Sequence, residues 1–176
     1  MIDLTLVSSR PEDDHFLFQV FTAARPGAGA AWGLAPAKAE DLLRVQFAAQ
    51  QAGYRARFPR AEFSIIHRGP VPVGSMIVDR SGDEIHLVDI ALLPEFRGQG
   101  IGTRLLEVVQ TEAEAAGLPV GLSVAKDNRA LNLYGRLGFC RMADDGVYLK
   151  MEWRTRNGPP RSGQGLSCGG RQDSRR

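Results

Sequence analysis

Three glycines alternate with other residues in the stretch Arg97-Gly98-Gln99-Gly100-Ile101-Gly102. Glycine has no Cβ, so the backbone of this stretch can approach a bulky anion closely. Pro94 ends the apolar segment before it, because proline has no N–H for a strand ladder. After the glycines Ile101, Leu105 and Val109 recur at helical spacing. A helix start offers unpaired N–H groups and a positive dipole end, and Arg97 adds a charge. The pattern therefore predicts a phosphate or pyrophosphate site.

The spacing of these glycines differs from the two common nucleotide motifs. No Gly-Lys-Ser/Thr follows, as a Walker motif requires, and the spacing does not match the dinucleotide-binding fingerprint. A plain turn between a strand and a helix would also explain glycines at these positions. The glycines alone therefore leave both interpretations open.

Side chains that could move protons lie just before the glycines and near residue 134. Glu84 and His86 are two residues apart in an expected strand, so they share a face. Histidine exchanges protons near neutral pH, which suits a general base. Asp89 falls on the opposite face unless a bulge shifts the register. Each of the three could equally be a solvated or hydrogen-bonded strand residue. By residue type alone, Tyr134 is a packing tyrosine with an exposed hydroxyl.

These residues need a scaffold of alternating strands and helices. Ser9 is the expected cap of the first helix, and Gly53, Gly117 and Gly138 are the expected ends of later helices. We expect strands over residues 2–7, 62–67, 73–79, 84–93, 120–125, 139–142 and 147–153. We expect helices over residues 9–25, 36–52, 101–116 and 129–137.

Length and composition suit one globular domain over residues 1–153, followed by a disordered tail over 154–176. The 176 residues are 43% hydrophobic and 24% charged, which is ordinary for a soluble protein. The tail is rich in Gly, Pro, Ser and Arg, with almost nothing to bury. From residue 157 onward the tail holds four Arg and one Asp, which gives it a charge of +3. Since the net charge of the whole chain is +2, the rest of the chain carries about −1. The remaining −1 argues against a nucleic-acid-binding body.

Neither a membrane span nor a secretory signal is expected from the sequence. No apolar run approaches the length of a span, and the N-terminus has no signal pattern. Two cysteines, Cys140 and Cys168, are too few to indicate a disulfide framework or a metal cluster. We therefore expect a cytoplasmic protein without a metal.

Two stretches and the order of elements resemble one known family. Residues 92–102 resemble the Arg-x-x-Gly-x-Gly acyl-CoA motif of the GNAT N-acetyltransferases. Residues 128–139 resemble the family's Asn…Ala…Leu-Tyr…Leu-Gly-Phe helix, although Asn128 lies two residues before Ala130 where three is commoner. The resemblance covers residues 2–153 and is strongest from 84 to 139. It implies the α/β (α+β) GNAT fold, a mixed, mostly antiparallel central sheet flanked by helices and splayed between strands 4 and 5.

The resemblance also implies roles for individual residues. Acetyl-CoA would be the acyl donor, without a metal. Tyr134 would protonate the leaving thiolate, and Glu84 is the first choice of base, with His86 beside it. The residues implied in cofactor binding are Ile90, Leu92, Leu93, Arg97, Gly98, Gln99, Gly100, Ile101, Gly102, Thr103, Asn128 and Tyr134.

The expected function is direct transfer of an acetyl group from acetyl-CoA to a primary amine of a small molecule or peptide. Two alternatives are a GNAT-fold module that binds acyl-CoA without turnover and a phosphate- or nucleotide-binding regulator. The expected partners are acetyl-CoA and an unidentified amine, with no nucleic acid or membrane, for a monomer or homodimer. The family builds its acceptor site from segments that correspond to 16–54 and 142–148. There Trp32, Phe47, Tyr54 and Phe58 line an apolar pocket or pack in the core.

Overall fold

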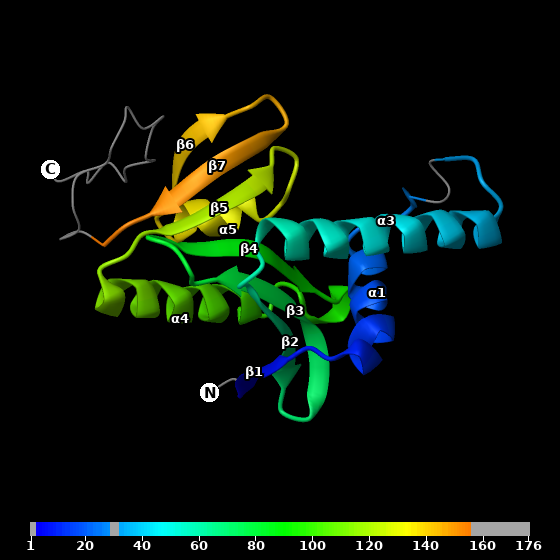
Figure 1. Ribbon diagram of the computed structural model, residues 1–176, viewed down its shortest axis with the longest axis horizontal. Helices are drawn as coiled ribbons and strands as arrows, with labels where there is room; N and C mark the ends of the chain where they lie inside the picture. The colour runs from blue at the N-terminus through cyan, green and yellow to red at the C-terminus, as the bar shows by residue number, and fades with distance from the viewer. Residues whose placement is uncertain (1–2, 29–31, 156–176) are drawn as a thin grey trace, which may run out of the picture. The chain divides into compact units, whose positions relative to one another are not determined.

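The computed structural model describes residues 3–28 and 32–155 (Figure 1). The strands are β1 (Leu4–Ser8), β2 (Glu62–Arg68), β3 (Val71–Asp79), β4 (Ile85–Leu92), β5 (Val120–Ala125), β6 (Cys140–Asp144) and β7 (Tyr148–Trp153). The α-helices are α1 (Asp14–Ala23), α3 (Pro36–Arg57), α4 (Ile101–Ala116) and α5 (Leu131–Arg136), with short 3-10 helices η1 (Pro11–Asp13) and η2 (Pro94–Phe96). Of the disordered tail expected over residues 154–176, only Arg154 and Thr155 are described, and their side chains bind Glu152 and Glu114. The rest of the tail, including Cys168, lies outside the described residues.

The seven strands form one sheet in the order β1-β2-β3-β4-β5-β7-β6. The pairs β1–β2, β2–β3, β5–β7 and β6–β7 are antiparallel, whereas β4 and β5 are parallel. The parallel pairing joins only Ile85–Leu87 to Val120–Leu122, and it ends before either strand does. The predicted fold class is therefore confirmed: a mixed, mostly antiparallel sheet with flanking helices, whose β4–β5 pairing stops early.

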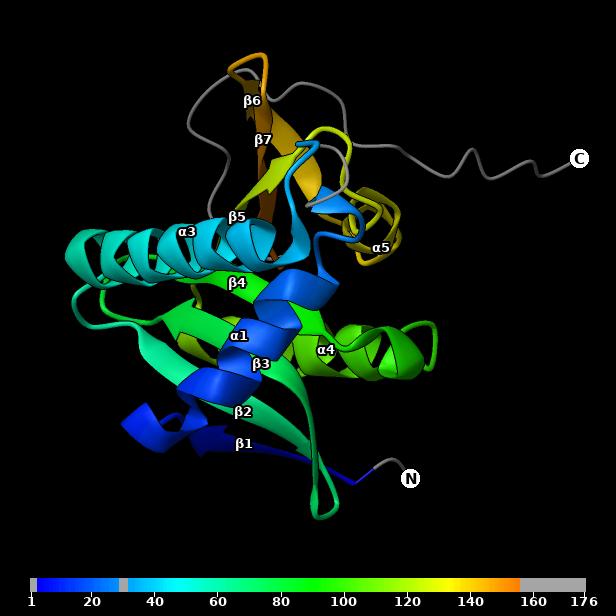
Figure 2. The same ribbon diagram turned by 90° about the vertical axis from the view of Figure 1, so that its right-hand side faces the viewer.

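The chain divides into two compact units, and the first comprises residues 1–80 and 88–102. In this unit α1 packs against β3 and α3, and Figure 2 shows α1 lying across the strands with α3 crossing it. Aromatic rings fill this crossing. Phe47 of α3 lies edge-on to Phe18 and Phe21 of α1, with ring centroids 5.7 and 5.5 Å apart. Such pairs stabilise a contact beyond the area that they bury.

The second unit comprises residues 81–87 and 103–176, and within its described part β5, β6 and β7 lie side by side (Figure 1). Apolar residues alternate along its strands, so that one face of the sheet is buried: Val120, Leu122, Val124, Leu149 and Met151. Helix α4 buries Leu105, Leu106, Val109 and Ala113. Gly117 ends α4 at a φ of 67°, and the N–H of Leu118 donates to the carbonyl of Ala113 at 2.9 Å, as in a Schellman motif.

Two expectations about helix ends were wrong. Ser9 does not cap the first helix. Its N–H donates to the carbonyl of Phe63 at 2.8 Å, and the Asp13 carboxylate instead accepts the N–H of Arg10. Gly53 does not end α3, which continues to Arg57. Arg55 and Arg57 in the last turn complement the negative end of the helix dipole, which outweighs the weak helix preference of one glycine.

Candidate active site

The glycine stretch forms a loop between the end of β4 and the start of α4, as expected. Gly98 and Gly100 adopt φ angles of 71° and 80°, in the left-handed region that favours glycine. A Cβ added to either would meet nothing within 4 Å, so one side of the loop is open. Within the described parts of the chain, the N–H groups of Gly98, Gln99 and Gly100 have no hydrogen-bond acceptor. Open N–H groups beside a helix start fit a phosphate group.

Two side chains of the loop brace it rather than point away from the protein. The Arg97 guanidinium donates to the carbonyl of Leu92 at 2.8 Å and to that of Ala23, at the end of α1, at 3.1 Å. The Gln99 amide donates to the carbonyl of Glu95 at 2.6 Å and accepts from Arg68 of β2 at 2.7 Å. Arg68 and Ala23 are thus supports of the loop that the sequence analysis missed, since both are distant in the chain.

The end of β4 also depends on a glycine that the sequence analysis missed. The N–H of Leu93 donates to the carbonyl of Val73 in β3 at 2.9 Å. A Cβ on the next residue, Gly74, would collide with the carbonyl oxygen of Ala91 and lie 2.8 Å from Cδ2 of Leu92. Only glycine therefore lets β3 approach this part of β4. The expected cofactor residues Ile90, Leu92 and Leu93 follow one another here, directly before the loop.

Asp89 lies in the same unit and has an altered acidity. Burial raises the pKa of its carboxyl from 3.8 to about 6, while the charge of Arg25 and a hydrogen bond from the N–H of Ile90 lower it by less. The charge that acts on the Asp89 carboxyl is thus that of Arg25. Glu84 and His86, the other two candidate bases, lie in the second unit and contact each other.

Glu84 and His86 form a close pair. Oε1 of Glu84 lies 2.7 Å from Nδ1 of His86, and their side chains are 39% and 22% exposed. His86 pairs in register with Gly121 of β5, and Gly121 pairs with Glu152 of β7, so the three residues form a row across neighbouring strands. A Cβ on Gly121 would lie 2.5 Å from Oε2 of Glu84. Gly121 therefore leaves the space that the Glu84 carboxylate occupies.

An ion pair lies at the end of the same row. The Arg154 guanidinium binds both carboxylate oxygens of Glu152, at 2.7 and 3.1 Å. This hydrogen bonding raises the pKa of Arg154, and the charges of Glu152 and Glu84 add to the increase. The Glu84 charge thus acts on Arg154 together with that of Glu152.

Tyr134 lies in α5, and Asn128 precedes that helix. The Asn128 side chain accepts the N–H of Ala130 at 2.8 Å and so forms a turn just before α5, whose N-cap is Ala130 rather than Asn128. Tyr134 is 6% exposed, and its ring lies edge-on to Phe139, with the centroids 5.7 Å apart. Its carbonyl accepts the N–H groups of Leu137 and Phe139. Tyr134 is therefore held firmly, although the contact to Phe139 also gives it a packing role.

The structure divides the expected site residues between its units. The first unit brings together those of the β4 end and the glycine loop, residues 90–102. The second holds Glu84, His86, Thr103, Asn128 and Tyr134. Across residues 3–28 and 32–155, no three His, Cys, Asp or Glu side chains gather where they could hold a metal ion. No described helix is both long enough and apolar enough to span a membrane.

Comparison with known proteins places this geometry among acetyltransferases. The model of the Acetyltransferase (GNAT) family matches residues 31–139. No curated protein matches the chain. Among solved structures, the PaiA N-acetyltransferase of Thermoplasma acidophilum, in complex with coenzyme A, is 18% identical with a TM-score of 0.66. The match covers 88% of this chain and 100% of that one.

Two further structures have the same fold. An acetyltransferase from Thermus thermophilus is 22% identical with a TM-score of 0.60, and the match covers 88% of this chain and 100% of that one. Ard1 from Thermoplasma volcanium is 18% identical with a TM-score of 0.56, and here the match covers 86% and 96%.

Proposed function

This chain belongs to the GNAT acetyltransferase family, and we propose that it transfers the acetyl group of acetyl-CoA directly to a primary amine of a small molecule or peptide. The family supports acyl transfer, and the donor and acceptor are our assignment. We place the reaction in the cytoplasm, with the protein acting as a monomer or homodimer.

The observation that carries the proposal is the open glycine loop. Its N–H groups at residues 98–100 have no acceptor among the described residues, and a Cβ added to Gly98 or Gly100 would meet nothing within 4 Å. Backbone donors at a helix start suit the pyrophosphate of coenzyme A. The braces from Arg97 and Gln99 hold the donors in place before the ligand arrives, which reduces the ordering cost of binding. The thioester, when bound, supplies an activated acetyl group.

For the proton of the attacking amine we assign His86 as the base and Glu84 as its positioning residue. The 2.7 Å contact means that Nδ1 of His86 donates to the ionised Glu84 carboxylate. The base is then Nε2, and the carboxylate stabilises the imidazolium that forms when His86 takes the proton. Glu84, first choice as the base from sequence, thus acts through His86. Asp89 has a different neighbour, Arg25, and we give it no part in this transfer.

For the proton of the departing thiolate we assign Tyr134. Its phenol can donate, and its ring is held by burial and by the contact to Phe139. A positioned acid contributes about 10²–10⁴-fold to a rate, less where a leaving group departs easily, as a thiolate does.

The test has two parts. Calorimetry with acetyl-CoA, CoA and ATP measures donor binding, and a screen of amines, amino acids and peptides by thiol release and mass spectrometry detects acetyl transfer. We expect acetyl-CoA to bind and at least one amine to be acetylated. Binding without any transfer would instead indicate the non-catalytic acyl-CoA module, and equal binding of ATP would indicate the phosphate-binding regulator.

The roles of the base pair are tested on the acetylated amine. His86→Ala should lower the rate most at low pH, where deprotonated amine is scarce, and less as pH rises. Glu84→Gln should show the same pH signature more weakly, because it removes the orienting charge but not the base. His67→Ala is the matched control, since His67 is a partly buried strand histidine outside the pair. A pH profile of His86→Ala parallel to that of the wild type would contradict the assignment.

A further inference from the structure

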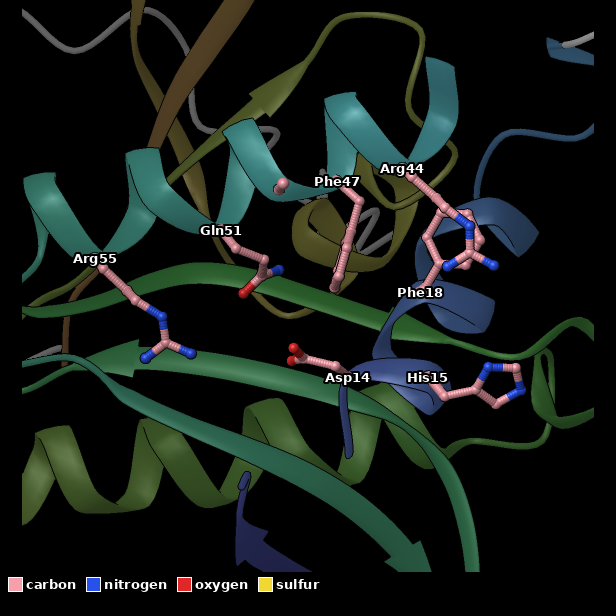
Figure 3. Close-up of a pocket in the computed structure, with 8 residues that line it drawn as sticks. Asp14, His15, Phe18, Arg44, Phe47, Gln51 and Arg55 are labelled. Atoms are coloured by element: carbon pink, nitrogen blue, oxygen red, sulfur yellow. The ribbon is translucent and has the colours of Figure 1, made fainter. Parts of the chain in front are cut away.

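A pocket of about 440 Å³ lies between α1 and α3 in the first unit (Figure 3). Its apolar wall is made by Phe18 of α1 and Phe47 of α3, whose rings meet edge to face. Its polar lining includes Asp14 of α1 and Gln51 and Arg55 of α3. The volume lies within the range of small-molecule sites, and the lining combines two aromatic rings with several polar and charged side chains.

Two of the three charged side chains that line this space, those of Asp14 and Arg55, are not neutralised by the described part of the chain. Among the described residues, the Asp14 carboxylate has no cationic or hydrogen-bonding partner, and the Gln51 amide has no hydrogen bond. The Arg55 guanidinium lies 4.3 Å from the ring centre of Phe63 but pairs with no carboxylate of the described chain. The third charged side chain of the lining, that of Arg44, differs because it binds Glu40 at 2.6 Å. Figure 3 shows Gln51 and Arg55 pointing from α3 toward the side on which Asp14 lies.

We propose that this pocket binds a zwitterionic amine of the amino-acid class with an apolar side chain. Its ammonium pairs with Asp14, its carboxylate with Arg55 and Gln51, and its side chain lies against Phe18 and Phe47. A ligand with only one charge would leave the opposite charge of the pocket uncompensated. Charge-assisted hydrogen bonds at both ends together with the aromatic wall therefore favour a zwitterion over either singly charged analogue.

This inference concerns binding and does not need the transfer reaction. In one respect it rests on the proposed function: if acetyl transfer holds, amino acids of this class are the first acceptors to test. A binding measurement without acetyl-CoA therefore fails or succeeds separately from the acetylation screen.

Both charged residues also suit their helix ends, and the experiment must separate the two roles. Asp14 lies in the first turn of α1, and Arg55 in the last turn of α3. Arg57 shares that last turn and stacks near an aromatic ring, Phe58, but does not line the pocket. Arg57→Met is therefore the matched control for Arg55→Met, because both remove a charge from the same helix end.

The experiment is calorimetry on the full chain with L-phenylalanine, L-leucine, phenethylamine and 3-phenylpropionate at up to millimolar concentration. We expect at least one amino acid to bind about tenfold or more tightly than the singly charged analogues, since a hydrogen bond to a charged group is worth about 1.5–3 kcal/mol. Arg55→Met should weaken amino-acid binding by about tenfold or more and leave phenethylamine unchanged. Asp14→Asn should weaken it similarly and leave 3-phenylpropionate unchanged.

Melting temperatures of all variants are measured alongside, and we expect little change because both residues are exposed. The inference is overturned if neither amino acid binds to the wild type, or if all four compounds bind equally. It is also overturned if Arg57→Met weakens binding as much as Arg55→Met, because the effect would then come from the helix end rather than the pocket.

Discussion

Replacing Gly121 by alanine tests the Glu84–His86 pair without touching either residue. The new Cβ would lie 2.5 Å from Oε2 of Glu84, whereas ordinary contact begins at 3.4 Å, so the carboxylate must move by about 0.9 Å. Starting from 2.7 Å, a displacement of that size away from His86 takes Oε1 beyond hydrogen-bonding distance of Nδ1. The variant therefore removes the orienting bond while keeping the base.

The expected size of the effect follows from the bond that is lost. A hydrogen bond to a charged group is worth about 1.5–3 kcal/mol, and each 1.36 kcal/mol is a factor of ten in rate. kcat/KM should thus fall by about 10- to 150-fold. Stability should hold or rise slightly, because glycine inside a strand costs about 0.5–1 kcal/mol relative to alanine and the displaced group is the flexible end of a side chain.

The assay is thiol release with an amine identified by the screen, accompanied by thermal unfolding. Ser123→Ala is the control, since Ser123 is the next residue on the same face of β5 and is exposed. In a Glu84→Ala background the Gly121→Ala change should cost nothing further, because the group that it displaces is absent. An equal loss of rate with and without the Glu84 side chain would refute the reasoning, as would an unchanged rate in Gly121→Ala.

Four further predictions follow from the same geometry. Gly100→Val should weaken acetyl-CoA binding about tenfold or more, because a β-branched residue is strained at a φ of 80° and its side chain would fill the open side of the loop; calorimetry giving an unchanged Kd would contradict the site. Tyr134→Phe should lower kcat by up to about 10²–10⁴-fold with little change in the affinity for acetyl-CoA, and an unaltered kcat would remove its acid role. Because the pKa of Asp89 is raised to about 6, folding stability should fall as pH rises from about 4 to 6, where only the unfolded chain has lost the proton. Asp89→Asn should remove this decline and raise the free energy of unfolding, measured in urea at pH 7, by up to about 3 kcal/mol. A gain that does not depend on pH would argue against the raised pKa. Gly74→Ala should lower the melting temperature by several degrees, because its Cβ meets backbone atoms of β4 that cannot rotate away; a melting temperature equal to that of the wild type would show that β4 yields.

The sequence by itself determined the features that depend on neighbours along the chain. At the candidate cofactor site, Pro94 marks the end of the strand and the alternating glycines mark the turn before the helix. Both signals belong to single residues, because proline has no N–H donor and glycine readily adopts positive φ angles. Periodic apolar residues likewise determined the order of strands and helices, and the two motifs together indicated the GNAT family. The errors at Ser9 and Gly53 arose where a contact distant in the chain or a whole helix outweighed one residue's preference.

Only the tertiary structure decided which distant residues meet. Arg68 supports Gln99 from 31 positions away, and Arg97 reaches the carbonyl of Ala23 across 74. Gly121 makes room for Glu84 because parallel pairing sets β5 beside β4, and neither residue type implies the other. The pocket between α1 and α3 depends on how the two helices pack, with Phe18 and Phe47 meeting edge to face. Such contacts depend on strand order, register and helix packing, which arise from the burial of the whole chain rather than from any local pattern.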